Sequence, residues 1–256
     1  FPIGINYYLY SVVAILKSNY MKQDLFLTRN FFTSFILSLL FKKHILEIHD
    51  DIKIESRIVQ FLVKYIKILN FNSLIKIVTT TKSLKKRYLR YGVIQNKIHI
   101  LHNASSLKSQ FNVYKKNKKL KIGYFGSIFK SRGIQMILKL SILDKKNEYY
   151  IFGGTIKQIN KIKVKFQNRN LFFCPHIPYS KVGNEIKKVD VCILPYTSKI
   201  TVSGNVGDIS KYTSPLKIFD YMKLGKLIIS SNLPVLREVL FNKNNILLIN
   251  KFNDER

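Results

Sequence analysis

From about Lys119 onward, short apolar runs alternate with amphipathic stretches that have the length of helices. The apolar runs cover residues 121–127, 148–154, 170–177, 190–196, 226–231 and 245–249, and the amphipathic stretches cover residues 131–143, 155–166, 179–189, 214–225 and 233–240. This alternation is typical of βαβ units around a parallel sheet. Gly133 and Gly225 fall at junctions, where turns and helix ends favour residues that tolerate positive φ.

The first hundred residues repeat this alternation less completely. Strand-like runs cover residues 44–50, 74–81 and 97–104, helix-like stretches cover residues 55–69 and 82–92, and the chain before His44 is mostly helical in character. A polar, basic stretch without a sustained period joins the two blocks, and we expect a linker within residues 108–118. The sequence therefore predicts an α/β chain of two doubly wound, Rossmann-like domains, residues 1–112 and 113–256.

The net charge of +30 is compatible with three kinds of partner: nucleic acid, an anionic membrane surface or a phosphorylated substrate. Only eight of the 44 basic residues are arginine, and the lysines are spread along the whole chain with Ile, Asn, Phe and Tyr. An AT-rich coding sequence would impose this composition. Because the lysines are dispersed rather than gathered with aromatic residues on one face, the pattern argues against a nucleic-acid-binding protein.

Cys174 and Cys192 each lie in an apolar, strand-like run, so packing accounts for them and a reducing compartment fits. The apolar stretches 5–16 and 31–41 are shorter than the ~20 residues that span a bilayer. We expect a cytoplasmic protein, either soluble or peripheral on the inner face of the membrane. The sequence begins at Phe1 without a methionine and ends where a new helix starts, so we expect truncation at both ends.

The segment TSPLKIFDYM, residues 213–222, predicts a helix whose first turn can bind a phosphate. Ser214 is a suitable N-cap, and Pro215 in the first turn has no N–H group to leave unpaired. The free N–H groups of Leu216 and Lys217 would then lie at the positive end of the helix dipole. Asp220, one turn further, could accept hydrogen bonds from sugar hydroxyls. An ordinary capped amphipathic helix explains the segment as well.

The longer segment SPLKIFDYMKLGKLIISSNLPVLREVL resembles the donor-binding signature of the retaining glycosyltransferases of family 4, also called glycosyl transferases group 1. In that family a second stretch reads Gly-Arg and, some five residues later, Lys-Gly, and it corresponds here to YFGSIFKSRG. Gly126 keeps the glycine, Ser127 stands in place of the arginine, and Arg132 stands in place of the lysine. The guanidinium of Arg132 suits a diphosphate because it can donate two bonds at once. Lys130 and Lys217 are candidates to replace the missing cation.

The resemblance also implies roles for residues with less distinctive surroundings. Asp220 matches the second of two family glutamates separated by seven residues and is expected to contact the donor ribose, with a catalytic role. Tyr212 occupies the place of the first glutamate, for which Asp208 is a possible substitute. By the same alignment, His176 and Ile177 lie near the nucleobase and contact it through main-chain groups.

His49 ends the run LEIHD, which resembles the family strand whose terminal histidine contacts the transferred sugar. A histidine at a strand end is more often structural, but strand ends in doubly wound sheets are where ligands bind. Asp50 and Asp51 follow it and could indicate a metal site or hydrolase carboxylates. Because enzymes of the GT-B class need no bound metal, we interpret them as capping or cleft groups and expect neither a metal nor a cofactor.

The resemblance implies a GT-B fold, with two domains facing a cleft and the N-terminal domain incomplete. The implied activity is that of a retaining, hexosyltransferase-type enzyme that moves a sugar from a nucleotide-diphosphate sugar to a saccharide or lipid-linked acceptor in surface polysaccharide biosynthesis. No Gly-rich loop follows a first strand, so this fragment is expected to bind donor weakly or to be inactive alone. The alternatives are a degenerate transferase module that serves as a binding or assembly partner and a basic nucleic-acid-binding protein.

Residues 57–69, RIVQFLVKYIKIL, are amphipathic and basic, so they could lie on an anionic membrane where lipid-linked acceptors are built. A helix packed against its own sheet explains this segment equally well.

Overall fold

The computed structural model describes residues 5–20, 23–108, 118–201, 207–241 and 245–250. The chain forms two compact units: unit 1 comprises Phe1–His102 and Lys211–Ser214, and unit 2 comprises Asn103–Ser210 and Pro215–Arg256. The boundary expected between residues 112 and 113 lies outside the described residues. Residues 103–108 belong to unit 2, and the four residues 211–214 belong to unit 1 although they are distant in the sequence.

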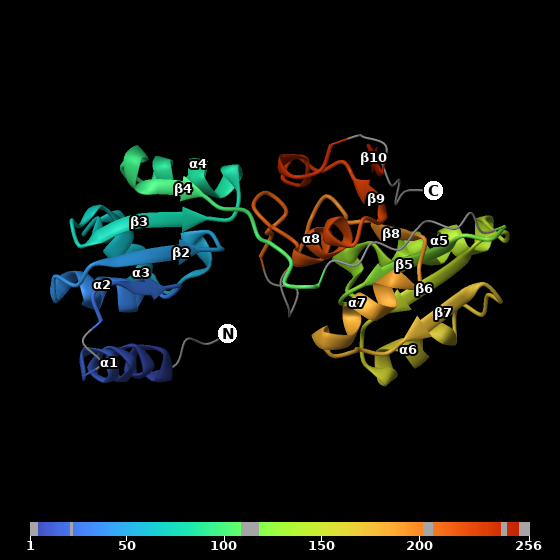
Figure 1. The fold of residues 1–256 in the computed structure, drawn as a ribbon, viewed down its shortest axis with the longest axis horizontal. Helices are drawn as coiled ribbons and strands as arrows, with labels where there is room; N and C mark the ends of the chain where they lie inside the picture. Colours follow the sequence, from blue (N-terminus) through green and yellow to red (C-terminus); the bar gives the residue numbers. More distant parts are fainter. Residues whose placement is uncertain (1–4, 21–22, 109–117, 202–206, 242–244, 251–256) are drawn as a thin grey trace. The chain divides into compact units, whose positions relative to one another are not determined.

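Unit 1 is built on a parallel sheet in the order β1-β2-β3-β4 (Figure 1). The strands are β1 (Phe26–Thr28), β2 (His44–Ile48), β3 (Leu74–Thr79) and β4 (Ile98–Ile100). Its helices are α1 (Ile5–Tyr20), α2 (Phe31–Leu39), α3 (Arg57–Lys64) and α4 (Lys82–Arg90), with short 3-10 helices η1 (Ile52–Ile54), η2 (Ile68–Asn70) and η3 (Gln95–Lys97). Polar side chains cap three of the helices: Asn30 for α2, Ser56 for α3 and Thr81 for α4.

In unit 1 one predicted helix is too long and one strand was not predicted. The helix expected over 55–69 ends at Lys64, because Lys67 takes a left-handed conformation (φ 55) and turns Ile68 and Leu69 into the core. The strand β1 was missed because it has three residues, too few for a period to be visible.

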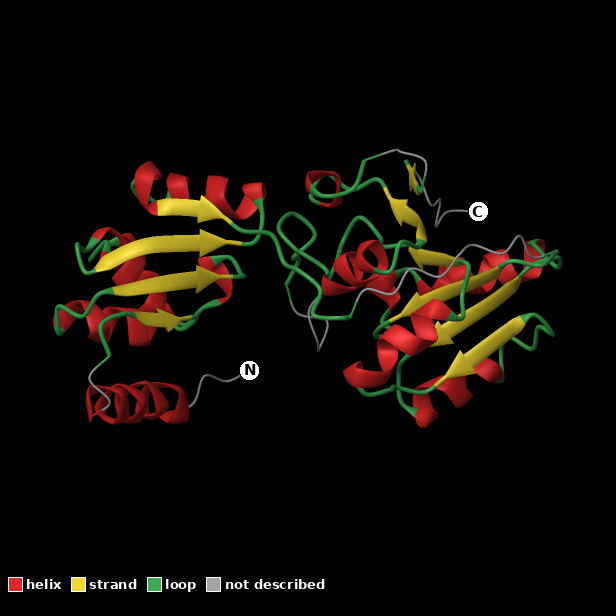
Figure 2. Ribbon diagram, viewed as in Figure 1, coloured by secondary structure: helices red, strands yellow, loops and turns green. Residues whose placement is uncertain are grey.

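Unit 2 is a six-stranded parallel sheet in the order β10-β9-β8-β5-β6-β7, seen side by side in Figure 2. The strands are β5 (Lys121–Phe125), β6 (Glu148–Phe152), β7 (Leu171–Cys174), β8 (Val191–Leu194), β9 (Leu227–Ser231) and β10 (Ile246–Ile249). The helices are α5 (Ile134–Leu143), α6 (Ile156–Lys163), α7 (Tyr179–Lys187) and α8 (Leu216–Lys223), with η4 (Lys130–Arg132) and η5 (Leu236–Glu238). The predicted helix over 233–240 is thus a single 3-10 turn.

Both faces of this sheet are buried, as the doubly wound pattern predicts. Phe125, Phe152 and Leu194 lie in one core cluster, whereas Tyr124 and Ile193 lie in the other. Cys192 is buried, Cys174 is half-buried, and both are free thiols. The strand order reverses between β5 and β8, and ligands of open α/β sheets bind beyond the carboxyl ends of strands at such a reversal.

No helix in the described part of the chain is long and apolar enough to cross a membrane.

Candidate functional site

Two glycines with positive φ lie at the carboxyl ends of β5 and β8, and a side chain at either position would cause strain. Gly126 follows β5 with φ 144, and a Cβ atom there would lie 2.1 Å from Nζ of Lys217. Gly133 precedes α5 with φ 74, and its Cβ would lie 1.6 Å from the carbonyl oxygen of Pro195, next to β8. These approaches bring a lysine and the start of α5 against the backbone at the point where the strand order reverses.

The amino group of Lys217 lies among aromatic side chains. Nζ lies 4.4 Å from the ring centroid of Tyr124 and 5.5 Å from that of Tyr196, and it is 3.3 Å from the hydroxyl oxygen of Tyr124. The guanidinium of Arg132 lies over the same Tyr196 ring, at 5.0 Å. Two cations from different elements, α8 and η4, therefore share one tyrosine ring.

This cation pair has no carboxylate partner among the residues that the structure describes. The side chain of Arg132 donates a long hydrogen bond, from Nη2 to the carbonyl oxygen of Thr201 at 3.4 Å, and it also interacts with the Tyr196 side chain. Burial, followed by repulsion from Arg132, lowers the pKa of Lys217 to about 7. Burial also raises the pKa of Tyr196, so the ring supplies no negative charge near neutral pH. The site is electropositive and suits an anion.

Ser127, expected beside this site, contributes through its main chain. Its carbonyl oxygen accepts a hydrogen bond of 2.8 Å from the hydroxyl of Tyr124, while its side chain is exposed. This hydrogen bond orients the ring of Tyr124, over which the amino group of Lys217 lies.

Helix α8 begins one residue later than predicted. Pro215, not Ser214, is the N-cap, with extended backbone angles (φ −68, ψ 116) and no side-chain cap. Ser214 lies one residue before that position. The first-turn N–H groups, which include those of Leu216 and Lys217, have no partner within the helix and lie at the positive end of its dipole. Their contact with a donor phosphate stays a prediction.

Asp220 is buried inside unit 2, where its Oδ1 atom accepts two hydrogen bonds. The hydroxyl of Ser105 donates at 2.6 Å and that of Tyr179 at 2.9 Å. These bonds tie α8 to the stretch after β4 and to the start of α7. The expected contact between Asp220 and a ribose stays a prediction, and it would have to be made at the Oδ2 atom or by displacement of one hydroxyl.

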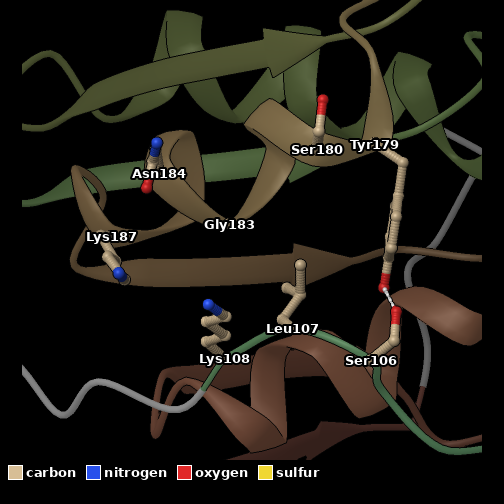
Figure 3. A pocket seen from close by; sticks show the side chains of 8 residues that line it. All are labelled: Ser106, Leu107, Lys108, Tyr179, Ser180, Gly183, Asn184 and Lys187. Atoms are coloured by element: carbon tan, nitrogen blue, oxygen red, sulfur yellow. Dashed lines mark hydrogen bonds between the residues drawn. The ribbon is translucent and has the colours of Figure 1, made fainter.

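A pocket of about 440 Å³ lies next to Tyr179 (Figure 3). In Figure 3 the ring of Tyr179 reaches down to Ser106, and the amino groups of Lys108 and Lys187 extend toward the space between α7 and the 106–108 segment. The complete lining is Ser106, Leu107, Lys108, Tyr179, Ser180, Gly183, Asn184 and Lys187. The pocket is polar and basic, and it adjoins the hydroxyl that holds Asp220.

His176 and Ile177 lie just beyond the carboxyl end of β7, two strands away from β5. The main-chain N–H of His176 donates to the carbonyl oxygen of Gly154 at 3.0 Å, and its side chain is exposed. Ile177 packs partly against the core cluster of Phe125 and Phe152. Their expected position near a nucleobase stays a prediction.

In unit 1, His49 follows β2 and pairs with a neighbour two residues away. Its Nε2 atom lies 2.5 Å from Oε1 of Glu47, and both side chains are partly exposed. Such a local partner on the same strand is typical of a histidine with a structural role. The predicted contact between His49 and a transferred sugar stays a prediction.

Asp51 has the capping role expected of it. Its Oδ1 atom accepts from the N–H of Lys53 at 3.2 Å and from the hydroxyl of Tyr91 at 2.8 Å, and its Oδ2 atom pairs with Arg87. Arg87 also lies 5.2 Å over the ring of Tyr212, a residue of the segment that returns to unit 1. Tyr212, which occupies the place of a family glutamate, is thus part of this packed cluster. Within the described ranges no group of three or more His, Cys, Asp or Glu side chains could hold a metal ion.

Sequence reasoning brought Gly126, Arg132 and Lys217 together but missed Tyr124 and Tyr196, the rings between them. Tyr124 is an inward-facing residue of β5, and Tyr196 follows β8 beyond the last strand residue, so each reads as ordinary core. A signal was present: one tyrosine lies two residues before the glycine that follows β5, and another lies two residues after the end of β8. Only the strand order, which the sequence does not state, makes them neighbours.

No protein-family model matches the sequence, and no curated protein matches it significantly. Solved structures do resemble it. Anabaena Alr3699/HepE, solved with UDP and glucose, is 12% identical, with a TM-score of 0.66 over 96% of this chain and 69% of that chain. A Rickettsia africae glycosyltransferase is 15% identical, with a TM-score of 0.65 over 97% and 67% of the two chains.

Sucrose-phosphate synthase from Thermosynechococcus elongatus is likewise 15% identical, with a TM-score of 0.65 over 93% of this chain and 64% of that chain. At these identities the likeness concerns the fold. The two parallel α/β sheets and these neighbours show that the chain has the GT-B fold, as the sequence predicted.

Proposed function

We propose that the chain is a glycosyltransferase module that binds a nucleotide-diphosphate sugar in unit 2 and transfers the sugar to a saccharide or lipid-linked acceptor with retention of configuration. The observation that carries the proposal is the cation pair of Arg132 and Lys217, which lies at the strand-order reversal and has no carboxylate partner in the described part of the chain. A diphosphate supplies the missing negative charge. The GT-B fold and the UDP complexes of Alr3699/HepE support the same ligand class.

The chemistry follows from where charge develops. When the bond between the sugar and the diphosphate breaks, negative charge builds on the leaving diphosphate. Arg132, Lys217 and the first-turn N–H groups of α8 are fixed donors that would stabilise this charge more strongly than the charge of the intact donor. No protein nucleophile is required if the acceptor hydroxyl attacks from the face that the diphosphate leaves. No metal is required either, because the two cations carry out the neutralisation that a metal would otherwise supply.

Other residues keep narrower proposed roles. Gly126 permits close approach of the diphosphate, Asp220 contacts the ribose, and the main chain of His176 and Ile177 contacts the nucleobase. His49 contacts the transferred sugar. These roles rest on the family resemblance and, except for Asp220 in α8, on the places of the residues beyond strand ends. The acceptor class and a role in surface glycan synthesis rest on the resemblance alone.

Calorimetric titration of the whole chain with UDP, GDP and their glucose or mannose conjugates tests the proposal. We expect saturable binding of at least one nucleotide, competed by inorganic pyrophosphate, and release of the nucleotide when an acceptor glycan is added. Nuclear magnetic resonance of the product would report an anomeric configuration equal to that of the donor.

Nucleotide binding without any transfer would instead identify a degenerate module that has kept only the donor site. The departures from the family pattern at Ser127 and Tyr212 are the observation that supports this second candidate. Absence of nucleotide binding, combined with salt-sensitive binding of DNA, would contradict both.

A further inference from the structure

Helix α3 exposes an apolar stripe that packing against its own unit does not explain. Val59, Leu62 and Val63 face inward and are buried, so they satisfy the contact with the core. Ile58, Phe61 and Tyr65 are 54%, 52% and 73% exposed. Their spacing of three and four residues places them on one outward stripe of the helix. The segment is therefore apolar on two faces, and only one face is covered within unit 1.

The two aromatic rings of this stripe contact each other. The ring centroids of Phe61 and Tyr65 lie 5.4 Å apart at an interplanar angle of 32°. The chain just before and after the helix adds Ile54 and Ile66, which are 45% and 42% exposed. Exposed aliphatic and aromatic side chains therefore follow the chain from η1 to just past the end of α3. We call Ile54, Ile58, Phe61, Tyr65 and Ile66 the α3 surface.

Cations border the α3 surface. The side chains of Lys53, Arg57, Lys64 and Lys67 are exposed, and none of them forms a salt bridge among the described residues. Between residues 53 and 67 the one carboxylate is Glu55, which is half-buried, and burial raises its pKa. The exposed charges next to the α3 surface, on η1, on α3 and just after α3, are thus all positive.

We propose that the α3 surface docks onto an anionic lipid bilayer, with Phe61 and Tyr65 inserted at the headgroup level and the four cations set against lipid phosphates. An amphipathic helix with basic flanks binds an interface in this way, because apolar burial and attraction to anionic headgroups add. Phe and Tyr suit this depth, since Tyr keeps its hydroxyl in water while the ring is buried. Helix α1 also exposes apolar side chains, but Lys17 is its one charged residue, so charge identifies no occupant there.

This proposal does not depend on the donor site, because it rests on unit 1 alone. The test is co-sedimentation of the whole chain with phosphatidylcholine vesicles and with vesicles that also contain phosphatidylglycerol. We expect binding to the anionic vesicles and at least about tenfold weaker binding to the neutral ones, because each cation near the surface contributes about 1 kcal/mol. F61S/Y65S and R57E/K64E should each weaken binding to the anionic vesicles by about tenfold or more.

Helix α6 of unit 2 provides the matched control. It is also basic, with Lys157 and Lys161 exposed, and Ile156 and Val164 at its ends are 67% and 79% exposed. I156S/V164S and K157E/K161E remove the same kinds of group and should leave vesicle binding within about twofold. A far-ultraviolet circular dichroism spectrum and an unfolding midpoint equal to those of the parent chain show that each variant is folded.

Three outcomes would overturn the proposal. One is an equal loss for the α3 and α6 variants, which would mean that only the net charge of +30 matters. Another is unchanged vesicle binding in F61S/Y65S together with a change in molar mass by light scattering, which would make the surface a contact between copies of the chain. The third is weaker binding to DNA, but not to vesicles, in R57E/K64E.

Discussion

Each unit contains an arginine stacked on a tyrosine, and the two stacks differ in what completes them. In unit 1, Arg87 lies 5.2 Å over Tyr212 and pairs with the buried carboxylate of Asp51. In unit 2, Arg132 lies 5.0 Å over Tyr196, and its charged neighbour is a second cation, Lys217. The first cluster is electrostatically complete, whereas the second has an excess of positive charge. The same local arrangement is thus structural in one unit and a candidate ligand site in the other.

The two clusters also differ in how well their charged residues suit the helix starts where they lie. Asp51 lies where a capping residue is expected, and its side chain also contacts Arg87 in α4 and Tyr91 just after α4. Lys217 sits at the start of α8, where a carboxylate would be favoured by the helix dipole and a cation is not. A lysine held at that position, with its amino group against Gly126, is costly to folding unless an anion binds there.

The largest effect is expected in unit 1. Asp51→Ala leaves Arg87 and the hydroxyl of Tyr91 without their acceptor, and loss of one partner of a buried pair costs about 3 kcal/mol or more. We expect the free energy of unfolding, measured with urea, to fall by that amount while the affinity of any folded protein for UDP is unchanged. Glu185→Ala, which breaks the exposed pair with Lys188, should cost less than about 1 kcal/mol. If both substitutions lowered the free energy of unfolding equally, the Asp51 carboxylate would not be an essential partner of Arg87 and Tyr91.

The next effect is expected on ligand binding in unit 2. Arg132→Ala and Lys217→Met each remove a charge-assisted interaction with a diphosphate, worth about 1.5–3 kcal/mol, so the Kd for UDP should rise about tenfold to a hundredfold. Lys217→Met should leave the free energy of unfolding unchanged or raise it, because the buried amino group has no carboxylate partner among the residues that the structure covers. Lys223→Met, at the exposed end of the same helix, is the control and should not alter the Kd. A Kd unchanged by both site substitutions would place the diphosphate elsewhere.

A smaller effect is expected from pH. The lowered pKa of free Lys217, about 7, means that raising the pH above 7 removes the proton that a diphosphate needs. If only the charged form binds, the affinity for UDP should fall about fivefold between pH 7 and pH 8, since the competent fraction falls by that factor. Lys217→Arg keeps its charge and should flatten this dependence. A parent profile as flat as that of Lys217→Arg would contradict the role of Lys217.

Sequence patterns were sufficient for most of the fold because strands and helices here are short, regular and separated by glycines. The strands of unit 2 were all expected within a few residues of their bounds, and Thr155 caps α6 through a capping box. The ends of helices were harder to predict from the sequence than the strands. Since a residue before proline is extended whether or not it is the cap, the pattern at Ser214 and Pro215 could not decide where α8 begins.

The candidate site was only partly predictable, for a physical reason. The phosphate-binding character of the segment that contains Lys217 could be predicted from its residue types, whereas Gly126 and Arg132 were predicted from the family resemblance. Tyr124 and Tyr196 meet only because β5 and β8 are neighbours in the sheet, and strand order depends on tertiary packing. The hydrogen bonds from Ser105 and Tyr179 to Asp220 likewise join residues from three parts of the chain.

The central claim is that Lys217 and Arg132 form a cation pair that is completed by a diphosphate. Nuclear magnetic resonance of the lysine side chains, with the Lys217 signal assigned by its loss in Lys217→Arg, measures this directly through the pKa of Lys217 with and without saturating UDP. We expect a pKa of about 7 in the free protein and a value at least about two units higher in the complex, because the bound anion favours the ammonium. A pKa that is the same with and without UDP would contradict the claim.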